Sequence, residues 1–223
     1  MSDLAWEVRD DQVPFKNQYV SIAIILLNVA MFLLQITDPS GRMLIELAFV
    51  PESFFRSEEL WTIFTSMFMH ADITHIFFNM LFFYVVADDT ENALGHGFFA
   101  FTYFASGIFA TLLHAGFTLV APVALDIPLV GASGAIAGLI AVYGLLFPQR
   151  RLNVLLGFYF VRMSAKKYVI VFALMQLVFG FLLWGSSATA YFAHLGGLIA
   201  GGICGLAYRS MNKHHEQGYY STW

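Results

Sequence analysis

The chain has 223 residues, of which 59% are hydrophobic and only 12% are charged, and its net charge is −4. Soluble domains contain about 25% charged residues, so this composition excludes an ordinary soluble domain and indicates an integral membrane protein. The small net charge and the lack of a basic tract argue against a nucleic-acid partner, and the single cysteine, Cys204, excludes an internal disulfide.

The N-terminal segment, residues 1–17, is polar and mixed in charge. It lacks the basic region, short apolar region and small-residue cleavage site of a secretory signal peptide. We therefore interpret residues 1–17 as a tail, and we expect the first apolar stretch to be retained as a membrane helix.

Six apolar stretches are candidates for crossing a hydrocarbon core of about 30 Å. Backbone groups in lipid must be hydrogen-bonded within the protein, so these stretches are expected to be helices. They cover approximately residues 20–36, 67–87, 97–120, 132–147, 168–183 and 191–208. The predicted fold class is all-α, a polytopic membrane domain of six transmembrane helices over residues 18–208, followed by a tail at residues 209–223.

Lysine and arginine are distributed unevenly between the two sides of such a protein. One side holds nine of them: Arg9, Lys16, Arg150, Arg151, Arg162, Lys166, Lys167, Arg209 and Lys213. The other side holds two: Arg42 and Arg56. Cytoplasmic loops are enriched in these residues, so both termini are predicted to be cytoplasmic and the segment before residue 133 to face the outside.

The segment over residues 38–66, between the first two predicted helices, mixes prolines, glycine and acidic residues with short apolar and aromatic pieces. Such pieces are typical of an element that lies in the membrane interface, and their apolar content argues against a disordered loop. We expect an embedded first loop in a position to shape access to a site from the side.

The second predicted helix carries an unusual polar cluster. His75 and Asn79 are four residues apart and share one helix face, which should point into the bundle. Both can donate a hydrogen bond to one oxygen, as an oxyanion hole requires. Two alternatives remain open for this cluster: interhelical hydrogen bonding, or a metal site with His70, Asp72 and His75, whose spacing does not place them cleanly on one face.

Ser133 lies in the run Gly131-Ala132-Ser133-Gly134, at the start of the fourth predicted helix. The flanking glycines let backbone approach the hydroxyl, and a helix N-terminus offers free backbone N–H groups. This run differs from the G-x-S-x-G elbow of soluble hydrolases. On its own it also fits a helix N-cap with packing glycines.

His194 lies at the start of the sixth predicted helix, and a serine with a histidine is the minimum set for nucleophilic acyl transfer. Glycines repeat every four residues in both helices, a pattern that allows two helix backbones to approach closely. The repeating glycines are Gly134 and Gly138 in the fourth helix and Gly197 and Gly201 in the sixth. Both helices begin on the outer side, so contact between Ser133 and His194 is expected.

These residues together resemble the rhomboid intramembrane serine proteases, in the minimal six-helix form typical of prokaryotes. The resemblance covers about residues 18–208 and is carried by Gly131 to Gly134, by Ala193-His194-Leu195-Gly196-Gly197 with Gly201, and by His70, His75 and Asn79. It implies an integral membrane endopeptidase of a prokaryotic inner membrane. The implied substrates are single-pass transmembrane proteins, cut near the outer face, and no cofactor or metal is implied.

The resemblance also implies roles for individual residues. Ser133 would be the nucleophile and His194 the general base in a dyad without an acidic third member. His75, Asn79 and the Ser133 backbone N–H would form the oxyanion hole. Structural roles near the site would fall to His70, Glu91, Trp61, Gly131, Gly134, Gly138, Gly197 and Gly201.

Two residues depart from the family pattern. Thr62 follows Trp61 where a Trp-Arg motif is common, which affects the usual anchoring of the first loop. Ala137 occupies a place where some members put an aromatic ring against the catalytic histidine, so a different orientation of His194 is expected. Neither change removes a reacting group.

Two other classes of function remain as alternatives. A catalytically inactive rhomboid-like protein would bind transmembrane clients without cutting them, but such proteins usually lose the serine or the histidine. A six-helix transporter would need a polar substrate path, yet the sequence shows no inverted hydropathy repeat or paired broken helices.

Overall fold

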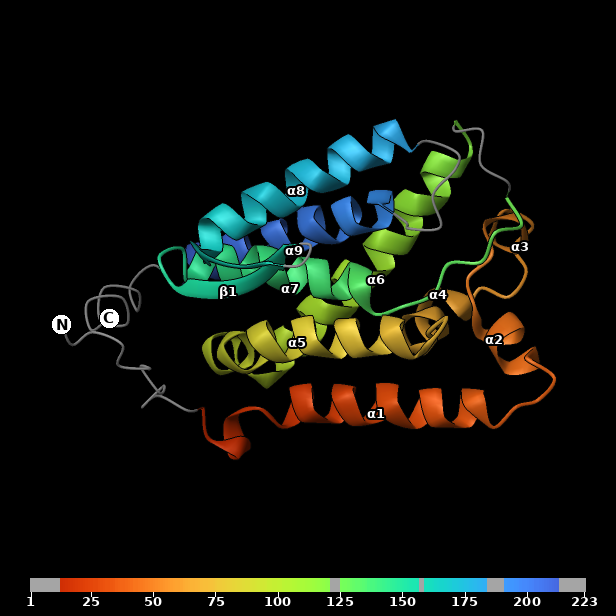
Figure 1. The fold of residues 1–223 in the computed structure, drawn as a ribbon, viewed down its shortest axis with the longest axis horizontal. Coiled ribbons are helices and arrows are strands. Elements are labelled where there is room, and N and C mark those ends of the chain that lie inside the picture. The colour runs from red at the N-terminus through yellow and green to blue at the C-terminus, as the bar shows by residue number, and fades with distance from the viewer. Residues whose placement is uncertain (1–12, 121–124, 157–158, 184–190, 213–223) are drawn as a thin grey trace.

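The computed structural model describes residues 13–120, 125–156, 159–183 and 191–212, and most of the two predicted tails, residues 1–17 and 209–223, lies outside this part of the chain (Figure 1). Helices dominate, with one β-hairpin near the cytoplasmic end of the predicted topology. In chain order the elements are the 3₁₀ helix η1 (Phe15–Asn17), α1 (Tyr19–Ile36), α2 (Arg42–Leu47), α3 (Pro51–Phe55), α4 (Thr62–Thr65), η2 (Ser66–Phe68), α5 (Ile73–Leu94), α6 (His96–Thr118), α7 (Ser133–Leu146), β1 (Arg151–Leu156), β2 (Tyr159–Ser164), α8 (Ala165–Leu182) and α9 (Tyr191–Met211).

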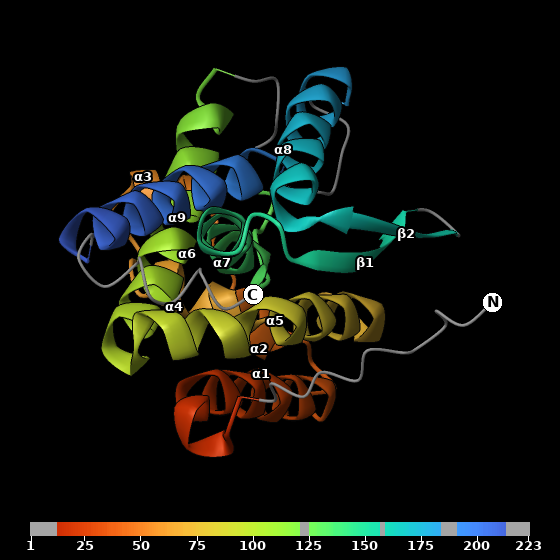
Figure 2. The same ribbon diagram turned by 90° about the vertical axis from the view of Figure 1, so that its left-hand side faces the viewer.

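Helix α7 is the centre of the bundle. Eleven of its 14 residues are buried, so other elements of the protein rather than lipid or water surround most of this apolar helix. Figure 2 shows α7 nearly end-on, with α5, α6, α8 and α9 arranged around it. Residues at the start of α7 are therefore held by protein on most sides.

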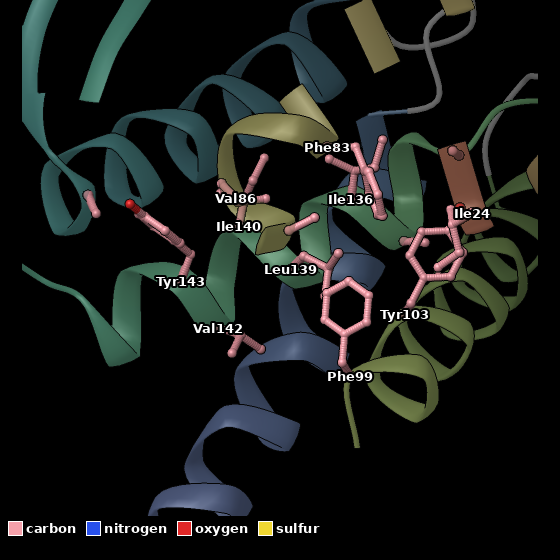
Figure 3. Close-up of a cluster of buried hydrophobic side chains, with 14 of the residues drawn as sticks. Ile24, Phe83, Val86, Phe99, Tyr103, Ile136, Leu139, Ile140, Val142 and Tyr143 are labelled. Carbon is pink, nitrogen blue, oxygen red and sulfur yellow. The ribbon is translucent and has the colours of Figure 1, made fainter. Parts of the chain in front are cut away.

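The hydrophobic core lies where α5, α6 and α7 meet, with α1 closing one side (Figure 3). Aromatic side chains from α5 and α6 pack edge to face there, with 5.7 Å between the ring centres of Phe83 and Tyr103. The labelled members of this core are Ile24, Phe83, Val86, Phe99, Tyr103, Ile136, Leu139, Ile140, Val142 and Tyr143. Close packing of these side chains fixes how α7 is oriented relative to α5.

A helix lies in each of the six predicted apolar stretches, but not every one has the length of a membrane span. Four helices of the described chain are long and apolar enough, namely α1, α6, α8 and α9. A fifth span is obtained if the α4–η2 segment and α5, which meet at 92°, are counted together. Helix α7 has 14 residues, or about 21 Å at 1.5 Å per residue, so by length alone the predicted count of six spans is not reached.

The second predicted helix begins later than the sequence pattern suggested. It was expected from residue 67, but the chain bends sharply after η2, and α5 starts at Ile73. The reason is a helix cap, because the side chain of Asp72 accepts a hydrogen bond of 2.8 Å from the backbone N–H of His75. The cap orients the first turn of α5, which carries the predicted polar cluster.

The acidic segment over residues 88–92 follows the second predicted apolar stretch, residues 67–87, and belongs to the last part of α5 rather than to a loop. Glu91 is fully buried there and accepts hydrogen bonds from the backbone N–H groups of Val20 (2.9 Å) and Ser21 (2.7 Å). A carboxylate is favourable at a helix N-terminus because the first N–H groups lack partners within the helix. Glu91 also contacts His96 Nδ1 at 2.6 Å and so joins α1, α5 and α6.

The basic loop after α7 contains an element that the all-α prediction did not include. Strands β1 and β2 form an antiparallel hairpin in which Leu152 pairs with Met163 and Val154 with Val161. Leu152 and Val154 are buried against the core, whereas the alternate residues Arg151 and Asn153 are exposed. This alternation is the pattern of a half-buried strand.

Candidate active site

Ser133 is the first residue of α7, and hydrogen bonds to the first loop hold the segment before it. Leu129 and Phe49 exchange two backbone hydrogen bonds of 2.7 and 3.0 Å, and the Gly131 N–H donates to the Ser66 carbonyl at 2.9 Å. Gly131 has φ of +115°, a conformation that residues with a side chain rarely adopt. The first loop thus fixes the backbone that presents the Ser133 hydroxyl.

His194, in the first turn of α9, lies in hydrogen-bond contact with Ser133. The distance from His194 Nε2 to Ser133 Oγ is 2.8 Å, although the two residues are 61 positions apart in the sequence. Both side chains are only partly buried. Both residues of the pair therefore keep some exposed surface.

The second imidazole nitrogen of His194 also has a partner. Its Nδ1 lies 2.9 Å from Oε1 of Gln176, a residue of α8. An amide oxygen only accepts hydrogen bonds, so this contact fits an imidazole that carries its proton on Nδ1, the form in which Nε2 can accept the hydroxyl proton of Ser133. A hydrogen bond donated by the serine hydroxyl to a neutral imidazole nitrogen is the arrangement that activates a serine as a nucleophile.

Close contact between α7 and α9 brings Ser133 and His194 together. A Cβ atom on Gly197 would lie 1.9 Å from the Gly134 carbonyl oxygen, and one on Gly201 would lie 2.1 Å from the Gly138 carbonyl oxygen. Real side chains do not approach backbone this closely, so any larger residue forces the two helices apart. The glycine spacing in both helices thus sets the distance between them.

Two neighbouring glycines of α9 give a matched test of this packing. Alanine at Gly201 is expected to lower stability by about 1–3 kcal/mol, because an added methyl group overpacks the helix contact. Alanine at Gly202, where nothing lies within 4 Å of the added Cβ, is expected to be neutral or to stabilise the helix by up to about 1 kcal/mol. Thermal unfolding midpoints in detergent measure both variants, and equal midpoints would contradict the packing argument.

His75 and Asn79 lie beside the segment that leads to Ser133. A Cβ on Gly131 would be 2.8 Å from Nε2 of His75 and 3.7 Å from Nδ2 of Asn79. The Ala71 N–H donates to Nδ1 of His75 at 3.3 Å, which leaves the proton of the neutral ring on Nε2. Two N–H donors therefore lie beside the backbone at Gly131, two residues before Ser133.

The bond from Asn79 to the His75 carbonyl uses only one of the two N–H groups of the Asn79 amide. Its Nδ2 donates to the His75 carbonyl one turn earlier at 3.0 Å, and the amide carries a second N–H. The residue is 5% exposed, so this second donor is shielded from bulk water. Shielding strengthens an electrostatic interaction with a developing negative charge.

His70 supports this arrangement from the other side. It is fully buried, its ring packs edge to face with His75 at 5.1 Å, and its backbone N–H and carbonyl both bond to the side chain of Gln35 in α1. Asp72 acts as the cap of α5. Within the described residues, no three His, Cys, Asp or Glu side chains come together as a metal site.

Two other predicted structural residues, Trp61 and Glu91, lie at the start of α4 and near the end of α5. Trp61 is 57% exposed at the start of α4, and the neighbouring Thr62 is buried with its hydroxyl donating to the Glu59 carbonyl at 2.7 Å. This hydroxyl bonds within the turn at the position where the family pattern commonly has an arginine. Glu91 lies about 24 Å along α5 from His75, at the opposite end of the helix.

Gln176 is the residue of the site that the sequence analysis did not identify. It is a buried amide in a helix whose neighbouring residues Met175 and Leu177 are exposed and apolar. A polar residue within an apolar span is a signal for an inward-facing position. That signal was present, but the sequence alone did not indicate which helix α8 would face.

Comparison with known proteins places the chain in a family. Residues 57–211 match the family model for the Rhomboid domain. The protein YdcA of Bacillus subtilis is 34% identical over 143 residues, which cover 64% of this chain and 64% of YdcA. Rhomboid-like protease 3 of Toxoplasma gondii is 29% identical over 190 residues, covering 82% of this chain and 65% of the relative.

The rhomboid protease GlpG of Salmonella choleraesuis is 28% identical over 184 residues, covering 82% of this chain and 59% of that protein. The chain thus matches less than two thirds of the length of each of these relatives. Because the domain match extends over more than half of the chain, this protein belongs to the rhomboid family.

Proposed function

We propose that the protein is an intramembrane serine endopeptidase in which Ser133 is the nucleophile and His194 the general base. The observation that carries this proposal is the 2.8 Å hydrogen bond between His194 Nε2 and Ser133 Oγ at the start of the central helix. The protease names of relatives such as GlpG support it.

The geometry suggests the following steps. Ser133 Oγ attacks a peptide carbonyl carbon while its proton passes to His194 Nε2. The carbonyl oxygen becomes an oxyanion that accepts hydrogen bonds from His75, Asn79 and the Ser133 N–H. Collapse of this intermediate transfers the proton from Nε2 to the leaving amine and leaves an acyl ester on Ser133.

Hydrolysis of the ester repeats the sequence with water. A water molecule attacks the acyl carbon and gives a proton to His194 Nε2, which then returns the proton to Ser133 Oγ as the acid product leaves. No other reactant is consumed. Water has to reach the ester from the outer side of the membrane, where the start of α7 is proposed to lie.

The membrane arrangement is part of this proposal. We assign α7 as a sixth membrane helix whose surroundings are protein rather than lipid, so that its length need not match the hydrocarbon thickness. Apolar side chains exposed on α1 and α8 fit lipid contact, among them Leu26, Leu33, Leu34, Leu174, Val178 and Leu182. The distribution of lysine and arginine favours cytoplasmic termini. The resemblance to the minimal six-helix rhomboid form favours the inner membrane of a prokaryote.

Substrates of this enzyme would be single-pass transmembrane proteins. A hydrogen-bonded helix hides its carbonyl groups from attack, so the substrate helix has to unwind near the outer surface before it is cut. The first loop over residues 38–66, which is bonded to the segment before Ser133, is the element that we propose to border the entry path.

Cleavage in proteoliposomes tests the proposed function. The wild-type protein is expected to cut a single-pass transmembrane substrate near its outer end, and the Ser133→Ala protein is expected to leave the same substrate intact while remaining folded. Undiminished cleavage by Ser133→Ala would refute the assignment. A wild-type protein that binds transmembrane clients but cuts none of them would instead favour an inactive rhomboid-like role.

A further inference from the structure

Gln176 is unusual within α8. Four residues of this helix are buried, Ala165, Tyr168, Gln176 and Gly180, and the first is at the start of the helix. Tyr168, Gln176 and Gly180 recur at multiples of four residues and so share the face that packs toward the bundle. Gln176 is 5% exposed, which means that its amide is placed among protein groups rather than in lipid or water.

The amide of Gln176 is directed at the imidazole of His194. Oε1 lies 2.9 Å from Nδ1, on the opposite side of the ring from the 2.8 Å contact to Ser133. One turn earlier in α8, the ring of Phe172 lies 6.0 Å from the imidazole centre. Helix α8 therefore supplies both an acceptor and an apolar wall for the histidine.

We propose that Gln176 is a positioning residue that fixes the tautomer and orientation of His194, an inference that rests on the proposed function of the Ser133 and His194 pair. A neutral imidazole carries its proton on either nitrogen, and only the Nδ1–H form leaves Nε2 free to accept from Ser133. An acceptor on Nδ1 selects this form. When Nε2 takes the serine proton, the same acceptor stabilises the resulting imidazolium.

This role accounts for the alanine at position 137. An aromatic ring there would hold the histidine from the side of α7, but the Ala137 side chain is a single methyl group buried at the α7–α9 contact. In this protein the histidine is held instead from α8, through a directional hydrogen bond. The bond acts in the plane of the ring, so it controls the proton position as well as the ring orientation.

Two substitutions at position 176 separate the hydrogen bond from packing. Methionine has a similar length and volume but no strong acceptor, whereas glutamate keeps the acceptor oxygen. Gln176→Met is expected to lower kcat for a transmembrane substrate by about 10- to 100-fold with KM nearly unchanged, the loss expected for one hydrogen bond to a buried group. Gln176→Glu is expected to recover most of this loss.

The control is Leu177→Met, a change at the adjacent position, whose side chain is 41% exposed. It is expected to leave kcat and KM at the wild-type values. The reaction of Ser133 with a small fluorophosphonate is expected to slow in Gln176→Met by the same factor as kcat, because this reaction needs the base but not the substrate helix. Wild-type kcat in Gln176→Met, or equal losses in the methionine and glutamate variants, would overturn the proposal.

A measurement on the unmodified protein covers the case in which Gln176→Met does not fold. Nitrogen-15 NMR of histidine-labelled protein distinguishes an imidazole that is protonated on Nδ1 from one protonated on Nε2, and a His194→Asn protein identifies the signal. The Nδ1–H form is expected for His194, and the Nε2–H form would overturn the proposal. If the wild-type protein is inactive, the proposed function fails, whereas an active wild type with the Nε2–H form removes only the role of Gln176.

Discussion

Alanine at Ser133, alanine at His194 and both changes together are expected to lower the rate of cleavage by nearly the same factor, about four to six orders of magnitude. The reason is that the two side chains act as one unit through the 2.8 Å hydrogen bond between Oγ and Nε2. Once either is missing, the other contributes nothing further. Single-turnover cleavage of a reconstituted transmembrane substrate measures the three rates.

Ser106→Ala is the matched control for these variants. Ser106 is buried in α6 against Gly138, and its hydroxyl has no hydrogen-bond partner among the described residues. Removing this hydroxyl is expected to leave the cleavage rate within about twofold of the wild type, as for substitutions that break no interaction. A double variant of Ser133 and His194 that is slower by the product of the two single losses would show that the side chains act independently.

Alanine at Asn79 is expected to lower kcat by about 10²- to 10³-fold while KM changes little, because one donor to the oxyanion is lost. The buried amide lies beside Gly131, two residues before the nucleophile. The charge on the carbonyl oxygen develops only as the reaction proceeds. Steady-state kinetics in detergent or in proteoliposomes separates the two constants.

Asn28→Ala controls for the structural part of this effect. Asn28 in α1 donates from Nδ2 to the Ile24 carbonyl one turn earlier at 2.8 Å, the same bond that Asn79 makes to the His75 carbonyl at 3.0 Å. Both amides are buried, so their loss has a similar direct effect on the helices. Equal reductions in kcat for Asn28→Ala and Asn79→Ala would mean that Asn79 acts only through helix stability.

Much of the candidate site was predictable because lipid makes polar residues costly. Ser133, His194, His75 and Asn79 each interrupt an apolar stretch, and such residues are expected to face the bundle interior. The glycines of α7 and α9 then indicated which two helices would touch. These are local signals, so they can be read from the sequence without knowledge of the remaining packing.

The features that escaped prediction depend on contacts between distant parts of the chain. Gln176 contacts His194 only because one face of α8 is turned toward α9. A single polar residue in the sequence of α8 does not reveal which neighbouring helix that face will meet. The carboxylate of Glu91 is accommodated inside a helix because the first turn of α1, 70 residues earlier, supplies two N–H donors. Because Asp72 caps the helix, α5 starts at Ile73 and not at residue 67, where the apolar stretch begins.

The β-hairpin was missed for a different reason. Its strands are short, and Leu152 and Val154 alternate with polar residues within a segment that also carries several basic residues. The basic residues led us to interpret this segment as a cytoplasmic loop. The alternation of apolar and polar residues that is typical of a strand was therefore overlooked. Burial of Leu152 and Val154 against the bundle core stabilises the hairpin.

Identification of the residue that a fluorophosphonate modifies tests the central claim most directly. The reagent phosphonylates only a serine whose hydroxyl is activated by a base, and peptide mass spectrometry locates the adduct. We predict one adduct, on Ser133, which is absent from the His194→Ala protein and unchanged in the Ser106→Ala protein. An adduct on another serine, or labelling of Ser133 that is independent of His194, would contradict the account.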